Sequence, residues 1–215
     1  MLIKVDTNPK YLVTLLYFFK TLRRIKGKDE TWKLLEDLVS LSLAYIYGGE
    51  IKRYGYKEPG KRVPDNIFII RTYPKGSPGK IDLVGIVDTK SSHLRLSSND
   101  VNKYLEYFKG MREIPVLNEA HSIVLYFVTI DSCKDIVQRW ERCKPGEGIK
   151  GFYQEISKRL NGNEYIAILT LDSLIVLIDS YLSAIRRIEI SLSKRTYIEN
   201  LDRYYYQIIT QQLSG

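Results

Sequence analysis

The chain has 215 residues, 44% of them hydrophobic and 27% charged, which is enough for one large folded domain and excludes an intrinsically disordered protein. A net charge of +8 favours a polyanionic partner such as nucleic acid, because each neutralised phosphate releases condensed counterions. Cys133 and Cys143, with only two histidines to supplement them, make neither a disulfide framework nor a four-ligand zinc site.

No segment of the sequence predicts export or a membrane span. The signal-like stretch 11–19 is followed by basic residues where a cleavage site would need small ones. The apolar run 171–190 is interrupted by charges, which could not cross about 30 Å of hydrocarbon without being buried. The interrupting charges are Asp172, Asp179, Arg186 and Arg187. We therefore expect a cytoplasmic protein that has no membrane partner.

The first part of the chain predicts two helices followed by three strands. Residues 9–25 show apolar side chains at the three-and-four spacing of an amphipathic helix. A second helix begins near Asp29, whose carboxylate can cap it, and ends at Gly48-Gly49. The three strands are expected over residues 50–56, 66–73 and 80–90. A turn rich in proline and glycine, 74–79, joins the last two strands as a hairpin.

The rest of the chain alternates helices and strands. Ser97 or Ser98 can cap a helix that ends near Gly110. The remaining elements are a buried strand at 121–130, a short helix at 152–160, a strand at 165–170, and helices at 171–190 and 194–213. The order α, α, β, β, β, α, β, α, β, α, α predicts an α/β sandwich. We expect a single domain over 1–215, with its core at about 29–130 and a C-terminal strand and helices within 131–215.

The hairpin brings two aspartates and a lysine together. If its turn centres near Ser77, Asp65 stands opposite Asp88 across the two strands. Lys90 projects to the same side as Asp88, about 6 to 7 Å further along, because alternate residues of a strand share a face. Two carboxylates and an ammonium group therefore converge.

A further aspartate on the same strand, Asp82, has a structural explanation. The same register sets Asp82 opposite Arg71, which predicts a cross-strand ion pair. Asp82 is six residues from Asp88, a separation of roughly 20 Å on a continuous strand, which is too far to share a metal ion. Only a sharp bend at Gly85 would let Asp82 replace Asp65 at the site.

This set of side chains suits metal-dependent hydrolysis of a phosphodiester. Mg²⁺ takes oxygen ligands at about 2.1 Å and keeps several waters, so Asp65 and Asp88 can hold Mg²⁺ or Mn²⁺ together with a phosphate oxygen. A lysine beside the ion, here Lys90, can orient or deprotonate the attacking water and offset charge on the transition state.

The motif resembles that of the PD-(D/E)XK nuclease superfamily. Pro64-Asp65 is followed, after about twenty residues, by Asp88-Thr89-Lys90 at the end of an apolar strand. The element order over 31–130 is similar to the core of that family: a helix, three strands, a helix and a further strand. The resemblance implies a restriction-endonuclease-like three-layer α/β sandwich with a mixed central sheet, to which this chain adds N- and C-terminal helices.

Within the superfamily, the chain looks most like the archaeal Holliday junction resolvases. Lys61-Arg62-Val63 before the Pro-Asp step, Ser91 after the lysine, and the polar run into helix 99–109 carry this comparison. Those resolvases also have a metal-linked glutamate on the first core helix, a role that the resemblance gives to Glu36.

The resemblance implies a DNA endonuclease with Asp65, Asp88 and Glu36 as ligands of Mg²⁺ or Mn²⁺ and Lys90 as the catalytic lysine. It also implies branched or junction DNA as substrate, and a homodimer, since resolvases cut two symmetrically placed strands. The chain departs from the resolvases in having Asp88 where they have glutamate, a longer hairpin, and about eighty-five residues beyond Ile130. Its richness in Tyr, Ile and Lys favours a viral or mobile-element nuclease of a hyperthermophilic archaeon, for example of the spindle-shaped virus type, which would act in the host cytoplasm if viral.

Several residues have a second interpretation. Glu36 can be a helix-surface charge, since Leu34, Leu35 and Leu38 occupy the core-facing stripe. His93 and His121 can contact phosphate or simply lie at the surface. Two basic groups either bind phosphate or are solvated helix ends: Lys20, Arg23, Arg24, Lys26 and Lys28, and Arg186, Arg187, Lys194 and Arg195. The tyrosines Tyr204, Tyr205 and Tyr206 either stack on bases or pack the last helix, at a dimer interface.

Two other functions stay open. A sequence-directed or repair endonuclease of the same superfamily would share the metal site and differ in the loops that face DNA. A non-catalytic DNA-binding protein on this fold would bind DNA in a salt-sensitive way without a divalent metal.

Overall fold

The computed structural model describes residues 9–22, 29–47, 50–53, 64–72, 80–90 and 93–191. The helices are α1 (Pro9–Leu22), α2 (Asp29–Tyr47), α3 (Val101–Arg112), α4 (Pro115–Asn118), α5 (Cys133–Arg142), α6 (Gly148–Ser157) and α7 (Leu171–Ser191), with a 3₁₀ turn at Ser98–Asp100. The strands are β1 (Glu50–Arg53), β2 (Asn66–Thr72), β3 (Lys80–Lys90), β4 (Ser122–Thr129) and β5 (Glu164–Thr170). The helix expected over 194–213, its three tyrosines, and the basic residues at 23–28 and 194–195 lie outside the described residues.

The strands form one mixed sheet in the order β1-β2-β3-β4-β5. β1, β2 and β3 are antiparallel neighbours, whereas β3, β4 and β5 run parallel. Parallel neighbours need a crossover connection, which α3 and α4 supply between β3 and β4, and α5 and α6 between β4 and β5. The α/β class and the mixed central sheet are therefore confirmed.

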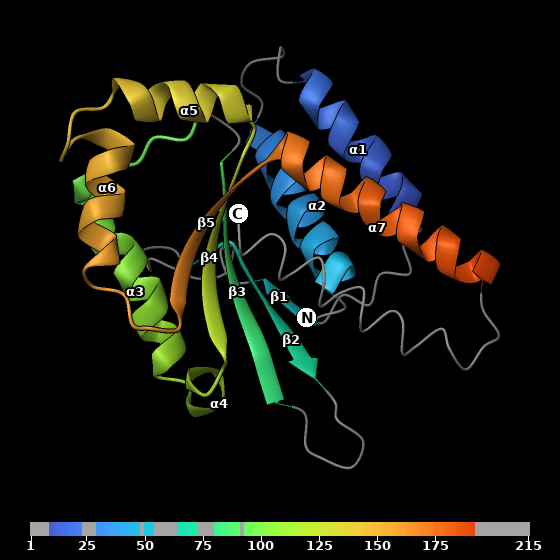
Figure 1. Ribbon diagram of the computed structural model, residues 1–215, viewed down its shortest axis with the longest axis horizontal. Helices are drawn as coiled ribbons and strands as arrows, with labels where there is room; N and C mark the ends of the chain where they lie inside the picture. The colour runs from blue at the N-terminus through green and yellow to red at the C-terminus, as the bar shows by residue number, and fades with distance from the viewer. Residues whose placement is uncertain are drawn as a thin grey trace.

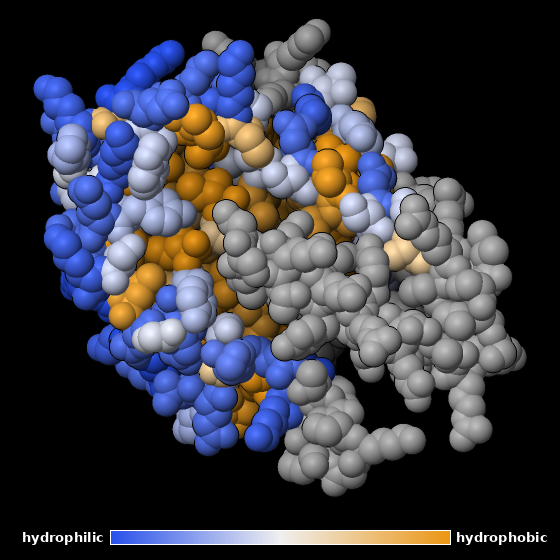
Figure 2. Space-filling model, in the orientation of Figure 1, coloured by the Kyte–Doolittle hydropathy of each residue, from blue (hydrophilic) through white to orange (hydrophobic). Residues whose placement is uncertain are grey.

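Helices cover both faces of the sheet (Figure 1). On one face α1, α2 and α7 form a hydrophobic cluster with the sheet, in which Leu43 packs with Phe68 of β2. On the other face Phe108 of α3 and Phe152 of α6 belong to a second cluster with Phe127 of β4. Figure 2 shows hydrophilic residues over the outer surface of α3 and α6 and hydrophobic residues between the two helical layers. This arrangement agrees with a three-layer sandwich.

The pairing of β2 with β3 follows the expected register at one end and departs from it at the other. Asn66 is opposite Val87, as the hairpin pattern predicts. Further along, a register shift sets Arg71 opposite Ile81. The expected pairing of Arg71 with Asp82 is therefore wrong, because a bulge inserts an extra residue into one strand and moves every partner beyond it.

Gly85 makes room for an aromatic ring and does not bend β3. A Cβ atom at Gly85 would lie 2.1 Å from the ring of Phe68, so only glycine allows the ring to pack there. β3 pairs with β4 without a break from Leu83 to the end of the strand. Asp82 consequently stays far along the strand from Asp88, as expected.

Helix α5 is the main element that the sequence pattern does not predict, and α4 is a shorter one. Hydrophobic side chains are sparse on α5, and two of them, Val137 and Trp140, are exposed. A capping box nevertheless begins the helix: the Ser132 Oγ accepts a hydrogen bond from the Asp135 N–H, and Asp135 Oδ2 accepts one from the Ser132 N–H. The Ser-x-x-Asp sequence is the signal that could have predicted α5.

As far as the described residues extend, none of the helices combines the length and apolar character needed to span a membrane.

Candidate active site

Asp65, Asp88 and Lys90 lie at the edge of the sheet where the parallel strands β3 and β4 end. Asp65 directly precedes β2, and its N–H donates a hydrogen bond of 3.1 Å to the carbonyl of Val87, which extends the β2–β3 pairing by one residue. Ile86 of β3 is buried in the cluster with α3. Because side chains alternate along a strand, Asp88 and Lys90 point to this same face. The structure thus brings together the two motif halves that the sequence predicts.

Asp88 is a buried carboxylate, 3% exposed, with several partners. Lys90 Nζ lies 2.6 Å from Asp88 Oδ2, and the Tyr104 hydroxyl donates a 2.9 Å hydrogen bond to the same oxygen. Lys103 Nζ lies 3.9 Å from the other oxygen, Oδ1. A buried charge needs such pairing and hydrogen bonding to be tolerated, so the four side chains act as one electrostatic unit.

Asp65 is the second carboxylate of the site and is partly buried. Its Oδ2 accepts a hydrogen bond of 2.7 Å from the N–H of Thr89, the residue between Asp88 and Lys90. Burial and the negative charge of Asp88 raise the pKa of Asp65 from 3.8 to about 6. The Thr89 N–H and the nearby lysines oppose this shift only in part. Asp65 therefore holds its proton more tightly than a free carboxyl group does.

Lys103 and Tyr104 belong to the site although sequence reasoning missed them. Both stand in the first turn of α3, where Lys103 Nζ lies 4.8 Å from the centre of the Tyr104 ring. Burial and the charge of Asp88 raise the pKa of Tyr104, which keeps its hydroxyl protonated as a donor. The sequence signal that could have identified them is the presence of a lysine and a tyrosine at the start of the helix that follows the motif strand.

Glu36 comes from a different side of the molecule. Its helix, α2, packs on the opposite face of the sheet, where Leu35 and Leu38 join the cluster with α1 and α7. Glu36 is only 8% exposed while Leu34 is 47% exposed, so the interpretation of Glu36 as a surface charge beside a buried Leu34 is wrong. Among the described residues no three His, Cys, Asp or Glu side chains form a group that could hold a metal, so Glu36 does not complete such a group with the two aspartates.

Two polar side chains next to the motif aspartates point to the α2 face. Asn66 follows Asp65, and Thr89 follows Asp88. Among the described residues, the Asn66 Nδ2 and the Thr89 Oγ1 are buried without a hydrogen-bond partner. Each such group lowers the stability of the fold relative to an apolar side chain of the same shape.

Four other residues singled out in the sequence lie elsewhere. His121 is exposed just before β4, at the amino end of that strand, and so at the opposite edge of the sheet from Asp88. Lys20 of α1 forms an ion pair with Asp172 of α7, which gives this member of the first basic group a role in helix packing. The thiol of Cys133 is exposed and that of Cys143 partly buried, and both are free.

Comparison with known proteins finds no family model that matches the chain and no curated protein with significant similarity to it.

Proposed function

We propose that the chain is a metal-dependent endodeoxyribonuclease of the PD-(D/E)XK type, which hydrolyses phosphodiester bonds. The observation that carries this proposal is the convergence of Asp65, Asp88 and Lys90 on one face of a mixed sheet, with Lys90 Nζ 2.6 Å from Asp88 Oδ2. The sequence motif predicts these three residues together, and open α/β sheets bind their ligands at the carboxyl ends of the strands.

The two carboxylates fit a hard divalent cation. Mg²⁺ is commonly held by only one or two protein carboxylates, with waters and substrate phosphate completing its octahedron, so Asp65 and Asp88 are a sufficient set. Burial and the charge of Asp88 disfavour the charged form of Asp65, and a bound cation would favour it. When bound, Mg²⁺ or Mn²⁺ would supply Lewis-acid polarisation of the phosphoryl oxygen.

Lys90, Lys103 and Tyr104 have different roles in the proposed mechanism. Lys90, whose side chain is 27% exposed, can reach both Asp88 and a water or phosphate in front of it. A cation there orients the attacking water and stabilises charge that develops on the phosphorus oxygens. Tyr104 fixes one oxygen of Asp88, and Lys103, 33% exposed, adds a second positive charge beside the carboxylates. Tyr104 and Lys103 are positioning residues in this scheme.

The substrate that we propose is branched or junction DNA, as the resemblance to the resolvases implies. A homodimer follows, because a junction is resolved by two symmetric cuts. The net charge of +8 supports a nucleic-acid substrate. We place the enzyme in the cytoplasm, that of the host if the chain is viral.

The experiment is cleavage of labelled four-way-junction, linear duplex and single-stranded DNA, with EDTA, Mg²⁺ or Mn²⁺. Asp88→Asn removes a proposed metal ligand, and Asp82→Asn is the matched control because it changes an aspartate of the same strand far from the site. We expect metal-dependent cleavage that Asp88→Asn abolishes and Asp82→Asn preserves, with the junction cut fastest. Fastest cutting of linear duplex would indicate a sequence-directed or repair endonuclease. No cutting with DNA binding intact in EDTA would contradict the nuclease and leave a DNA-binding protein.

A further inference from the structure

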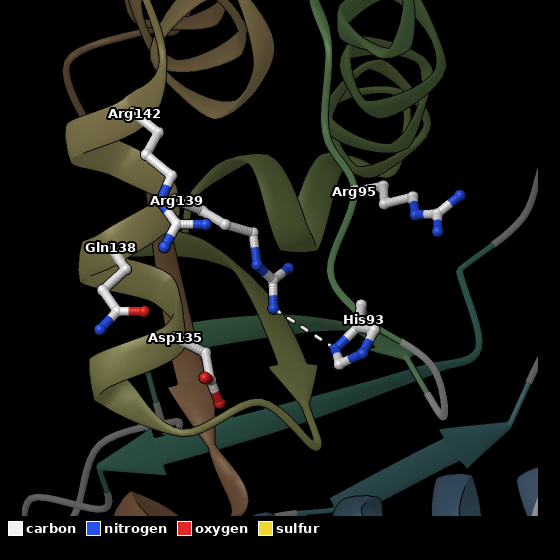
Figure 3. A pocket seen from close by; sticks show the side chains of 6 residues that line it. All are labelled: His93, Arg95, Asp135, Gln138, Arg139 and Arg142. Atoms are coloured by element: carbon white, nitrogen blue, oxygen red, sulfur yellow. Dashed lines mark hydrogen bonds between the residues drawn. The ribbon is translucent and has the colours of Figure 1, made fainter.

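A basic cavity lies between the loop after β3 and helix α5 (Figure 3). Its volume is about 330 Å³. The side chains that line it are His93, Arg95, Asp135, Gln138, Arg139 and Arg142. Figure 3 shows Arg139 reaching from α5 toward His93 on the opposite wall. The motif interpretation does not use any of these residues except, as one alternative, His93.

The cavity is held in shape by a carboxylate behind it. Asp131, 1% exposed, accepts hydrogen bonds from the Leu94 N–H (2.8 Å) and lies 2.6 Å from His93 Nδ1, both on the loop wall. The same carboxylate lies 2.5 Å from Arg139 Nη2 on the helix wall. Arg139 Nη1 also donates to the Leu94 carbonyl at 2.7 Å. Asp131 thus ties both walls together and fixes the guanidinium of Arg139 in one orientation.

The positive charge that remains available comes from Arg95 and Arg142. Both are exposed, and neither has a hydrogen-bond or ion-pair partner among the described residues. The acid that lines the cavity, Asp135, accepts hydrogen bonds from the N–H and hydroxyl of Ser132 at the N-terminus of α5. Guanidinium groups bind phosphate oxygens in a bidentate manner, so a pocket of arginines is suited to a phosphate.

The cavity lies close to the site along the sheet edge. His93 is three positions after Lys90 in the chain, which limits the distance between their Cα atoms to about 11 Å. Lys90 is also opposite Thr129 on the neighbouring strand, and the Thr129 hydroxyl donates to Asp131 at 3.1 Å. A DNA strand carries one phosphate per about 3.4 Å of helix axis, so a strand held at Lys90 brings another phosphate to the cavity within roughly three nucleotides.

We propose that the cavity lined by Arg95, Arg139 and Arg142 binds one backbone phosphate of the DNA strand, about three nucleotides from the bond cleaved at Asp65, Asp88 and Lys90. This inference rests on the proposed function for the position of the phosphate. The site positions the strand and carries no sequence information of its own.

The first test is DNA binding in EDTA, measured by fluorescence anisotropy at a series of salt concentrations. Arg95→Gln and Arg142→Gln are combined in one variant, because both side chains are exposed and their loss leaves the Asp131 contacts intact. Lys109→Gln is the matched control, since Lys109 lies at the far end of α3 with a side chain 73% exposed. We expect the double variant to lower the slope of log affinity against log salt by about 0.9, the value for one lost phosphate contact, and the control to leave it unchanged.

A second measurement locates the phosphate. Single methylphosphonate substitutions, which remove the charge of one phosphate at a time, are scanned along the labelled strand. We expect one position to weaken binding of the wild-type protein about as much as the double substitution does, and to have no further effect on the double variant.

The outcomes separate this inference from the nuclease. A wild-type protein that cuts DNA while the double variant keeps the same salt slope and methylphosphonate profile overturns the phosphate site alone. A protein that cuts nothing but shows the reduced slope in the double variant refutes the nuclease and keeps the phosphate site. Equal effects of the double variant and Lys109→Gln would also overturn the phosphate site. The same holds if the wild type does not bind DNA.

Discussion

Two buried carboxylate clusters lie at the same edge of the sheet, and their electrostatics are opposite. Around Asp131, hydrogen bonds from Arg139, His93 and the Leu94 N–H outweigh the effect of burial and lower the pKa of the carboxyl group. Around the candidate active site, burial and the charge of Asp88 prevail and raise the pKa of Asp65 to about 6. The partners of Asp131 outweigh the effect of burial on its pKa, whereas the partners of Asp65 do not.

The difference distinguishes a carboxylate that holds the structure together from a pair that we propose binds a cation. A fully paired buried acid fixes the position of its partners, here the walls of the arginine cavity. A buried acid whose pKa is raised beside a second carboxylate is characteristic of functional sites, because folding alone would not favour it. Substitutions in the two clusters should therefore have different effects on activity and on stability.

After the loss of cleavage in Asp88→Asn, the largest effect is expected at Lys90. Lys90→Gln removes the cation beside the reacting phosphate, and we expect cleavage to fall by about 10²- to 10³-fold, the range for loss of one transition-state-stabilising group. Single-turnover cleavage measures this rate, and Lys109→Gln controls for the loss of one positive charge. Cleavage by Lys90→Gln at the wild-type rate would show that the lysine of the motif has no catalytic role.

The next effect is on stability and belongs to the other cluster. Asp131→Asn leaves Arg139 without its charged partner, and we expect the free energy of unfolding to fall by about 3 kcal/mol, as when one member of a buried ion pair is removed. Urea denaturation with an unchanged m-value measures it. Asp65→Asn is the contrasting variant, because it removes a repelled charge and should not destabilise the protein at pH 7. Equal losses in both variants would contradict the distinction between the clusters.

The pH dependence of stability should also differ between the clusters. Because the pKa of Asp65 is raised above its unfolded value of 3.8, the folded state binds this proton more tightly, and the contribution is fully present below pH 3.8. It is lost as pH rises through about 6, which amounts to a decrease of about 3 kcal/mol. For Asp131, with its lowered pKa, stability is lost only as pH falls below 3.8.

The difference in unfolding free energy between wild type and Asp65→Asn, measured from pH 4 to 7, isolates the first contribution. We expect this difference to change between pH 4 and 6 and to level off above. A difference that is independent of pH over this range would show that the pKa of Asp65 is not raised.

The smallest expected effect compares two threonines. The Thr89 Oγ1 is buried without a partner among the described residues, so Thr89→Val should leave stability unchanged or raise it by up to about 1 kcal/mol. The Thr129 hydroxyl donates to Asp131 at 3.1 Å, so Thr129→Val should lower stability by about 1 kcal/mol. Thermal unfolding of the two variants measures both changes, and a larger loss in Thr89→Val than in Thr129→Val would reverse the assignment.

The sequence predicts those parts of the molecule that depend on local periodicity. The hairpin pattern placed Asp65 opposite Asp88 because side chains alternate with a period of two, and the pairing of Asn66 with Val87 confirms that register. The same extrapolation failed at Arg71, because a bulge is a local change of the backbone that the period of the side chains does not predict. The pairing is as expected at Asn66 and differs from the expectation at Arg71, on the same strand.

The parts that depend on tertiary packing could not be predicted. Tyr104 and Lys103 reach Asp88 only because α3 packs on the face to which the motif points. No local sequence pattern singles out Asp131, because its partners His93 and Arg139 come from other segments of the chain. The burial of Glu36 likewise depends on the two helices beside α2, which the pattern of a single helix does not contain.

The most direct test is whether Asp65 and Asp88 bind a divalent cation. Mn²⁺ binding is measured by electron paramagnetic resonance in the presence of junction DNA, for the wild type, Asp65→Asn, Asp88→Asn and the control Asp82→Asn. We predict that the wild type and the control bind Mn²⁺ with the same affinity, and that each site variant weakens binding by at least about tenfold, equivalent to roughly 1.4 kcal/mol. Unchanged Mn²⁺ affinity in both site variants would contradict the metal site and, with it, the proposed nuclease mechanism.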